Sequence, residues 1–93
     1  MAKITSKQRA ELRSRAQSLN AVVMVGHDGI SEGVLTALDQ ALTDHELVKV
    51  RFQDFKDMAR ELSEELADKT GSTKIAVTGF TAVFYRENPE KRK

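Results

Sequence analysis

The apolar residues between positions 21 and 52 change their spacing twice, and this change constrains the fold more than any other feature of the sequence. Residues 21–25 form an unbroken apolar run, which is typical of a strand buried on both faces. From Ile30 to Leu42 the apolar residues recur at helical spacing, which predicts an amphipathic helix. Residues 46–52 then alternate between apolar and polar side chains, as a half-buried strand does. A strand, a helix and a second strand in this order favour parallel pairing of the two strands.

Two more helices are predicted on either side of this unit. Residues 5–19 carry a thin apolar stripe, and either Thr5 or Ser6 can cap the helix. We expect this helix to lean on the domain rather than to form the centre of its core. The apolar residues of 55–71 also follow the helical period, and Gly71 is expected to end that helix in a left-handed conformation.

The chain is predicted to close on a hairpin. Ile75 and Val77 alternate with other residues before Gly79, and Val83 and Tyr85 do so after it. Two strands joined by a tight connection explain this pattern.

The predicted fold is α/β, of the two-layer α+β type, with the order helix, strand, helix, strand, helix, strand, strand and a four-stranded mixed sheet. Lys49 and Arg51 would be costly beneath helices, so we expect the helices on one side of the sheet and open solvent on part of the other. Met24 and Met58 fall on apolar faces and are interpreted as core residues.

Length and composition predict a single domain. The chain has 93 residues, which support one core rather than two. It contains no cysteine, which excludes a disulfide framework and a thiolate metal site. No apolar stretch follows the first residues, so we expect neither a signal peptide nor a membrane span, and a cytoplasmic monomer. The segment from about residue 88 lacks periodicity and is predicted to be a basic, flexible tail.

The net charge of +1 conceals an uneven distribution. Residues 3–15 contain five Lys or Arg against one Glu, whereas residues 28–46 contain five Asp or Glu and neither Lys nor Arg. Residues 86–93 contain four Lys or Arg against two Glu. Both basic ends can contact a polyanion, and ordinary solvated charges are the alternative interpretation.

A Gly-x-x-Gly sequence, formed by Gly26, His27, Asp28 and Gly29, stands between the first predicted strand and the helix after it. Glycine permits close approach to the backbone, and the first turn of a helix leaves N–H groups unpaired. This arrangement predicts a seat for phosphate, as in KH domains, where such a loop clamps single-stranded nucleic acid. The alternative is a structural turn in which Asp28 or Ser31 caps the helix.

Several separated stretches also match a known family in the correct order, between Thr5 and Pro89. They are Lys7 with Gln8, Val22–Gly26, Gly29–Val34, His45–Val50 and Phe84–Arg86. On these stretches the sequence resembles the YhbY family, bacterial proteins made of a single CRM domain, the module of chloroplast RNA splicing and ribosome maturation factors.

The resemblance implies a fold similar to the carboxyl-terminal domain of bacterial translation initiation factor three. It also implies association with precursors of the large ribosomal subunit, ribosomal RNA as the partner with ribosomal proteins as further candidates, and neither enzymatic activity nor a cofactor. The residues expected to contact RNA are Gly26, His27, Asp28, Gly29, Lys7, Arg9, Arg13, Lys49, Arg51 and Arg86.

Two positions depart from the family pattern. Members of the wider module often carry a basic residue inside the Gly-x-x-Gly loop, where this chain has His27 and Asp28. Phe80 follows Gly79 where a basic residue is expected. Phe80 can offer a stacking surface for a base, but packing of its ring on its own sheet is the favoured interpretation.

Enzymatic and metal sites find little support. His45 and Glu46 begin like a zinc-protease motif, yet the second histidine is missing and the segment is predicted to be a strand. With only two histidines and no cysteine, the spacing does not support a tetrahedral zinc site. The acidic residues of 57–68 lie away from the apolar stripe of their helix, where carboxylates are normally solvated.

A rival hypothesis from another class is a protein-binding adaptor on the ribosome that makes no direct RNA contact. It would dock a ribosomal protein or assembly factor through the acidic region 28–46. Salt dependence separates the two hypotheses, because neutralising phosphates releases counterions and steepens the dependence of affinity on salt.

Overall fold

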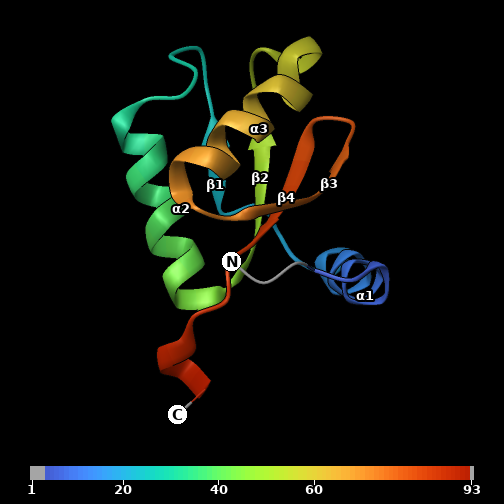
Figure 1. Cartoon of the computed structure of the whole chain (residues 1–93). Coiled ribbons are helices and arrows are strands. Elements are labelled where there is room, and N and C mark those ends of the chain that lie inside the picture. The colour runs from blue at the N-terminus through green and yellow to red at the C-terminus, as the bar shows by residue number, and fades with distance from the viewer. Residues whose placement is uncertain (1–3, 93) are drawn as a thin grey trace.

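Three helices and four strands follow one another in the predicted order over residues 4–92, the part of the chain that the computed structural model describes (Figure 1). Lys3 and Lys93, which belong to the basic ends of the sequence, lie outside the described residues. The elements are α1 (Ser6–Ala16), β1 (Val23–Val25), α2 (Glu32–His45), β2 (Leu47–Phe52), η1 (Lys56–Met58), α3 (Ala59–Thr70), β3 (Thr73–Thr78), β4 (Thr81–Tyr85) and η2 (Pro89–Arg92), where η denotes a short 3₁₀ helix.

The four strands form one mixed sheet in the order β1-β2-β4-β3. β1 pairs with β2 in parallel, whereas β4 is antiparallel to both β2 and β3. β3 and β4 form the predicted hairpin, since Thr78 pairs with Thr81 across a two-residue loop. Gly79 has φ +57° at the first position of this loop, as type II′ hairpins require. The predicted α+β fold with a mixed four-stranded sheet is therefore confirmed.

The main core lies between one face of the sheet and helices α2 and α3. The alternation predicted for β2 is present, because Val48, Val50 and Phe52 are buried against the helices. The largest fully buried side chains of this core are Phe52, Phe84, Leu38, Leu42, Leu66, Val25, Val48 and Val50.

Helix α1 packs on the opposite face of the sheet. Its buried residues are Leu12 and Ala16, which form a second, smaller core with Leu47, Ile75 and Val83. α1 is therefore an exception to the expectation that the helices share one side. The predicted thin stripe is correct, since two residues of this 11-residue helix are buried. α1 ends at Ala16 rather than at position 19.

β1 is not buried on both faces, contrary to the prediction from its apolar run. Val23 and Val25 are buried, but Met24 between them is 46% exposed. The reason is that β1 lies at the edge of the sheet, and the small core under α1 draws on β2, β3 and β4 instead. Met58 is likewise 44% exposed, at the start of α3. Neither methionine is a core residue.

A bulge in β3 places Ile75 and Val77 on different faces of the sheet. The register shifts between Lys74 and Ala76, so Ile75 is the extra residue. Ile75 belongs to the core under α1, whereas Val77 packs against the main core. Alternation along this strand therefore fails at the bulge.

The ends of the helices follow local chemistry. Thr5 caps α1 in a capping box, in which its Oγ1 accepts from the Gln8 N–H and Gln8 Oε1 accepts from the Thr5 N–H. Gly71 ends α3 with φ +65°, as predicted. α3 begins later than predicted, because Phe55 has a positive φ of 56° and a 3₁₀ turn precedes Ala59.

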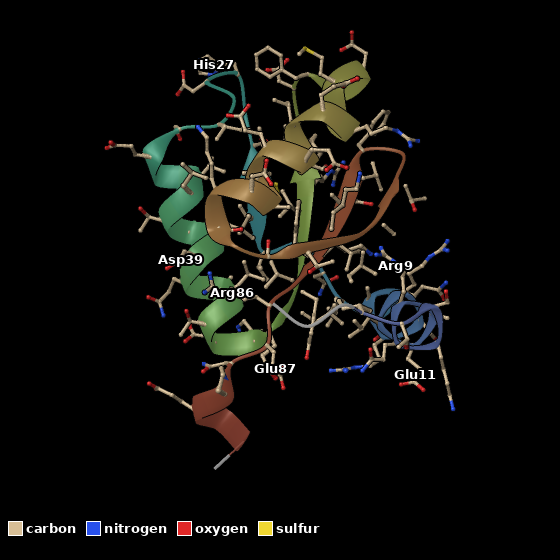
Figure 2. All side chains as sticks on the ribbon, viewed as in Figure 1. Arg9, Glu11, His27, Asp39, Arg86 and Glu87 are labelled. Atoms are coloured by element: carbon tan, nitrogen blue, oxygen red, sulfur yellow. The ribbon has the colours of Figure 1, made fainter. Side chains whose placement is uncertain are left out.

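Arg86 at the end of β4 links the two helices of the main layer. Its Nη1 donates to Asp39 Oδ1 at 2.7 Å and to the Thr70 carbonyl at 2.8 Å. Its Nη2 donates to the Asp39 carbonyl at 3.0 Å and to Thr43 Oγ1 at 2.9 Å. Figure 2 shows Arg86 beside Asp39 on α2. One guanidinium therefore satisfies acceptors on α2 and at the end of α3.

The segment after β4 is anchored at its beginning. The Asn88 N–H donates to Glu46 Oε2 at 2.6 Å, and Asn88 Nδ2 donates to the Thr43 carbonyl at 2.9 Å. A 3₁₀ turn, η2, follows, although the sequence predicted no regular structure here. The flexibility of the tail stays a prediction.

The Arg86 network predicts a loss of stability. We expect Arg86→Ala to lower the free energy of unfolding by about 2 kcal/mol, because carbonyl and carboxylate acceptors lose a charged donor. The control Arg51→Ala, at an exposed position of β2, should change it by less than about 0.5 kcal/mol. Urea denaturation measures both. Equal stabilities of the two variants would contradict the structural role of Arg86.

Candidate nucleic-acid interface

The Gly-x-x-Gly loop is a tight turn at the carboxyl end of β1. The Gly29 N–H donates to the Gly26 carbonyl at 3.0 Å, which closes the turn, and Gly29 has φ +67°. The side chains of His27 and Asp28 are 85% and 79% exposed, and His27 Nε2 lies 3.3 Å from Asp28 Oδ1. The loop therefore presents both side chains to solvent, but the N–H of Gly29 is already used inside the turn.

Helix α2 does not begin directly after this loop. It starts at Glu32, and Ser31 is its N-cap, with Ser31 Oγ accepting from the Val34 N–H at 3.2 Å. Of the two candidate caps, Ser31 is correct and Asp28 is not. Asp28 precedes the helix and Glu32 is its first residue. The negative charges of these two carboxylates would repel a phosphate bound at the amino end of α2.

The loop is held against the segment that follows β2. The N–H groups of Gln53 and Asp54 donate to the Val25 carbonyl at 2.9 and 3.4 Å. The ring of Phe55 lies beside Gly29, since a Cβ built on Gly29 would stand 3.6 Å from Phe55 Cε2. The sequence predicted Phe55 to be part of a helix, and its position beside Gly29 was not predicted. Its positive φ and its 40% exposure distinguish Phe55 from a buried helical residue.

The cations of α1 differ in their surroundings. Lys7 and Arg13 are exposed. Arg9 is partly buried, because its Nη1 donates to the carbonyls of Lys74 and Ile75 at 2.8 and 2.9 Å. These acceptors lie on β3, an edge strand, at its bulge. Arg9 therefore docks α1 on the sheet, whereas Arg13 is available to a ligand.

Lys49 and Arg51 lie on the face of β2 that is turned toward α1, opposite Val48, Val50 and Phe52. Arg51 is exposed, as predicted. Lys49 is partly buried at the end of α1, where its Nζ donates to the carbonyls of Ala16 and Leu19 at 3.3 and 3.4 Å. A cation at the carboxyl end of a helix is favourable, because the carbonyls there carry a partial negative charge.

These cations form one surface, which we call the basic face. It comprises α1 and the sheet face beneath it, and its cations are Lys7, Arg9, Arg13, Arg15, Lys49 and Arg51. Two hollows open on it, with volumes of about 530 and 190 Å³. Lys49 lines both, Arg15 lines the larger and Arg13 the smaller. Arg15 was counted in the basic segment 3–15 but was not singled out as a site residue.

The basic face does not include every predicted residue. His27 lies at the loop end of the molecule and Arg9 on α1, at separate places in Figure 2. Arg86 lies apart from both, where it bonds to α2 and the end of α3. The structure therefore brings Arg13, Lys49 and Arg51 to one face, places the Gly-x-x-Gly loop at another end and engages Arg86 in the fold.

Most of the acidic residues lie in the other layer. Eleven of the 14 Asp and Glu residues lie between positions 28 and 68, in α2, α3 and the segments that adjoin them. By contrast, α1 and β2 contain six Lys or Arg against a single acidic residue, Glu11. Lys74 and Arg86, at β3 and directly after β4, pair with Glu64 and Asp39 of the helical layer. The sheet therefore separates a positive side from a negative side.

No helix in residues 4–92 is long and apolar enough to span a membrane. Among the same residues, no three His, Asp or Glu side chains are grouped in a way that could hold a metal ion.

Comparison with known proteins identifies the relatives of this chain. The family model described as the CRS1 / YhbY (CRM) domain matches residues 4–86. A protein of Pseudomonas aeruginosa named a probable RNA-binding protein is 36% identical over 91 residues, which cover 97% of this chain and 88% of the relative. An RNA-binding protein of Haemophilus influenzae is 32% identical over 93 residues, covering 99% and 94%.

A solved structure agrees with these relatives. The solution structure of a Staphylococcus aureus protein matches with a TM-score of 0.81 and 36% identity, over 92% of this chain and 91% of that one. The similarity to initiation factor three stays a prediction.

The cap of α2 gives a test of the loop. We expect Ser31→Ala to lower the free energy of unfolding by about 1 kcal/mol, because the Val34 N–H loses its acceptor. Asp28→Ala should change it by less than about 0.5 kcal/mol. Thermal melts of the two variants measure the difference, and a larger loss for Asp28→Ala would show that the cap is misassigned.

Proposed function

The chain belongs to the CRS1 / YhbY (CRM) domain family, and we propose that it binds RNA as a single domain and catalyses no reaction. The relatives described above are named as RNA-binding proteins, which supports RNA as the partner. The observation that carries the proposal for this chain is the basic face, where exposed Arg13 and Arg51 flank partly buried Lys49.

The proposed binding mode follows from the positions of these cations. Phosphate contacts from Arg13, Lys49, Arg51 and Lys7 position the RNA, and few base contacts specify it. The Gly-x-x-Gly loop, Gly26 to Gly29, contributes a further backbone contact at the end of β1. Arg9 contributes positive potential from its docked position, and Arg86 contributes through the stability of the fold.

We propose further that the RNA is ribosomal RNA in a precursor of the large ribosomal subunit, that the protein acts there in assembly or maturation, and that it works in the cytoplasm. The resemblance of the Gly29–Val34 and His45–Val50 stretches to the YhbY family supports this assignment. Ribosomal proteins are candidate second partners, because the acidic layer points away from the basic face.

Crosslinking in cells tests this assignment directly. Ultraviolet crosslinking of the protein followed by sequencing of the attached RNA should enrich ribosomal RNA of the large subunit over its share of total RNA. A profile that follows RNA abundance, or reads from another RNA class, would overturn the ribosomal assignment. Recovery of proteins without RNA would favour the adaptor hypothesis, in which the acidic layer is the contact surface.

The proposed role of the basic face can be tested by reversing one of its charges. We expect Arg13→Glu to weaken binding to an rRNA stem-loop by roughly tenfold and to reduce the slope of log K against log salt by about 1. Arg60→Glu makes the same change at an exposed position of α3, in the acidic layer, and should leave both values close to wild type. Fluorescence anisotropy at several salt concentrations gives both quantities. Equal effects of the two variants would remove the basic face from the interface.

The proposed role of the Gly-x-x-Gly loop can be tested at Asp28. Asp28→Lys removes one negative charge and adds a positive one beside the proposed phosphate, so affinity for RNA should rise and its salt dependence should steepen. Because Ser31 is the cap, stability should not change. Asp68→Lys on α3 is the matched control, with the same charge change in the acidic layer. The loop is not part of the interface if both variants raise affinity equally.

A further inference from the structure

We propose that the larger hollow of the basic face binds one unpaired nucleotide, with the base inside the hollow and its phosphate on the surrounding cations. This inference rests on the proposed RNA binding and names a base-binding site within it. The hollow lies at the amino end of β1, whereas the Gly-x-x-Gly loop lies at the carboxyl end. It is therefore separate from the phosphate seat predicted from the sequence.

The walls of the hollow combine apolar and polar groups. The segment between α1 and β1 contributes Leu19, Asn20 and Val22, and the end of α2 contributes His45. Leu19 and Val22 are large apolar side chains with exposures of 37% and 59%. Its volume of about 530 Å³ lies within the range of pockets that hold small ligands. An apolar wall with amide and imidazole groups beside it suits the face and the edge of a base.

The charges around the hollow favour a ligand that carries an anion. Arg15 and Lys49 line it, and none of the residues lining either hollow is acidic, in a chain with 14 Asp and Glu. Lys49 is held in place by the Ala16 and Leu19 carbonyls. An ammonium group has three N–H donors, so two bonds to carbonyls leave one for a phosphate oxygen.

The second hollow indicates the path that a nucleic-acid strand would take across the basic face. It shares Lys49 with the larger hollow and is lined by Arg13, Gln17, Thr78 and Thr81 among others. A backbone that passes Lys49 would meet Arg15 at one hollow and Arg13 at the next. An RNA strand fits this succession of cations better than a protein segment, whose backbone carries no charge.

A single tryptophan can report on the hollow, because the chain contains none. Leu19→Trp places an indole on the wall, and Met58→Trp places one at a similarly exposed position at the start of α3. An RNA stem-loop with an unpaired loop should quench the emission of Leu19→Trp by stacking, whereas a fully paired duplex with the same number of nucleotides should not. Met58→Trp should respond to neither RNA.

Two further variants measure the contribution to affinity. Val22→Trp fills the hollow and should weaken stem-loop binding roughly 5- to 100-fold without changing the salt slope. Met58→Trp, at an exposed position at the start of α3, should bind as wild type. Asn20→Asp is isosteric and should also weaken binding, because it adds a carboxylate beside the phosphate. Thermal melts establish that the variants are folded.

The outcomes separate the two proposals. If wild-type protein binds the stem-loop with a steep salt dependence, while Leu19→Trp is not quenched and Asn20→Asp binds normally, the hollow is not a base site and the proposed function stands. Equal quenching by the duplex would also overturn the base site, since paired bases cannot enter the hollow. If wild-type protein binds neither RNA at any salt concentration, the proposed function itself fails.

Discussion

The contact between α1 and the second face of the sheet is the interaction on which the proposed RNA surface depends. An isolated helix of 11 residues is not stable in water, so α1 needs tertiary contacts. Leu12 and Ala16 supply a small apolar contact, and two cations add hydrogen bonds between α1 and the sheet. Arg9 reaches from α1 to carbonyls of β3, and Lys49 reaches from β2 to carbonyls at the end of α1. The same charges that dock the helix therefore create the positive potential of the basic face.

The position of α1 also explains how a chain of net charge +1 can attract RNA. A helix is about 10 Å across, so two helices with the sheet between them place the outer surfaces of the α1 side and the α2/α3 side more than about 20 Å apart. At physiological ionic strength the Debye length is about 8 Å. Solvent ions therefore screen the acidic layer from a ligand on the basic face. The net charge is a sum over both sides of the molecule and therefore does not describe the charge of either side.

Local patterns allowed most of the fold to be predicted, and long-range partners account for what was missed. The spacing of apolar residues predicted the seven elements and the mixed sheet, because the spacing within each segment depends on which of its faces is buried. It did not show that Leu12 and Ala16 pack on the second face of the sheet, since an apolar stripe predicts burial but not the surface that buries it. Arg86 and Asp39 lie 47 positions apart, and nothing in either segment predicts that bond. For the proposed site, the sequence indicated the basic segment but not the hollow that Arg15 and Lys49 line, because the hollow joins segments that are distant in the sequence.

The Gly-x-x-Gly loop shows why a sequence pattern and its electrostatics have to be considered separately. The glycines do form the tight turn, but the Gly29 N–H closes that turn and the Ser31 hydroxyl takes the Val34 N–H, so two donors of a possible phosphate seat are already used. Asp28 and Glu32 add negative charge nearby. The five residues from Val22 to Gly26, which include β1, span about 13 Å, so an RNA strand can touch both the larger hollow and the loop. In the proposed complex the basic face supplies most of the affinity, and the loop marks where the RNA path leaves the sheet.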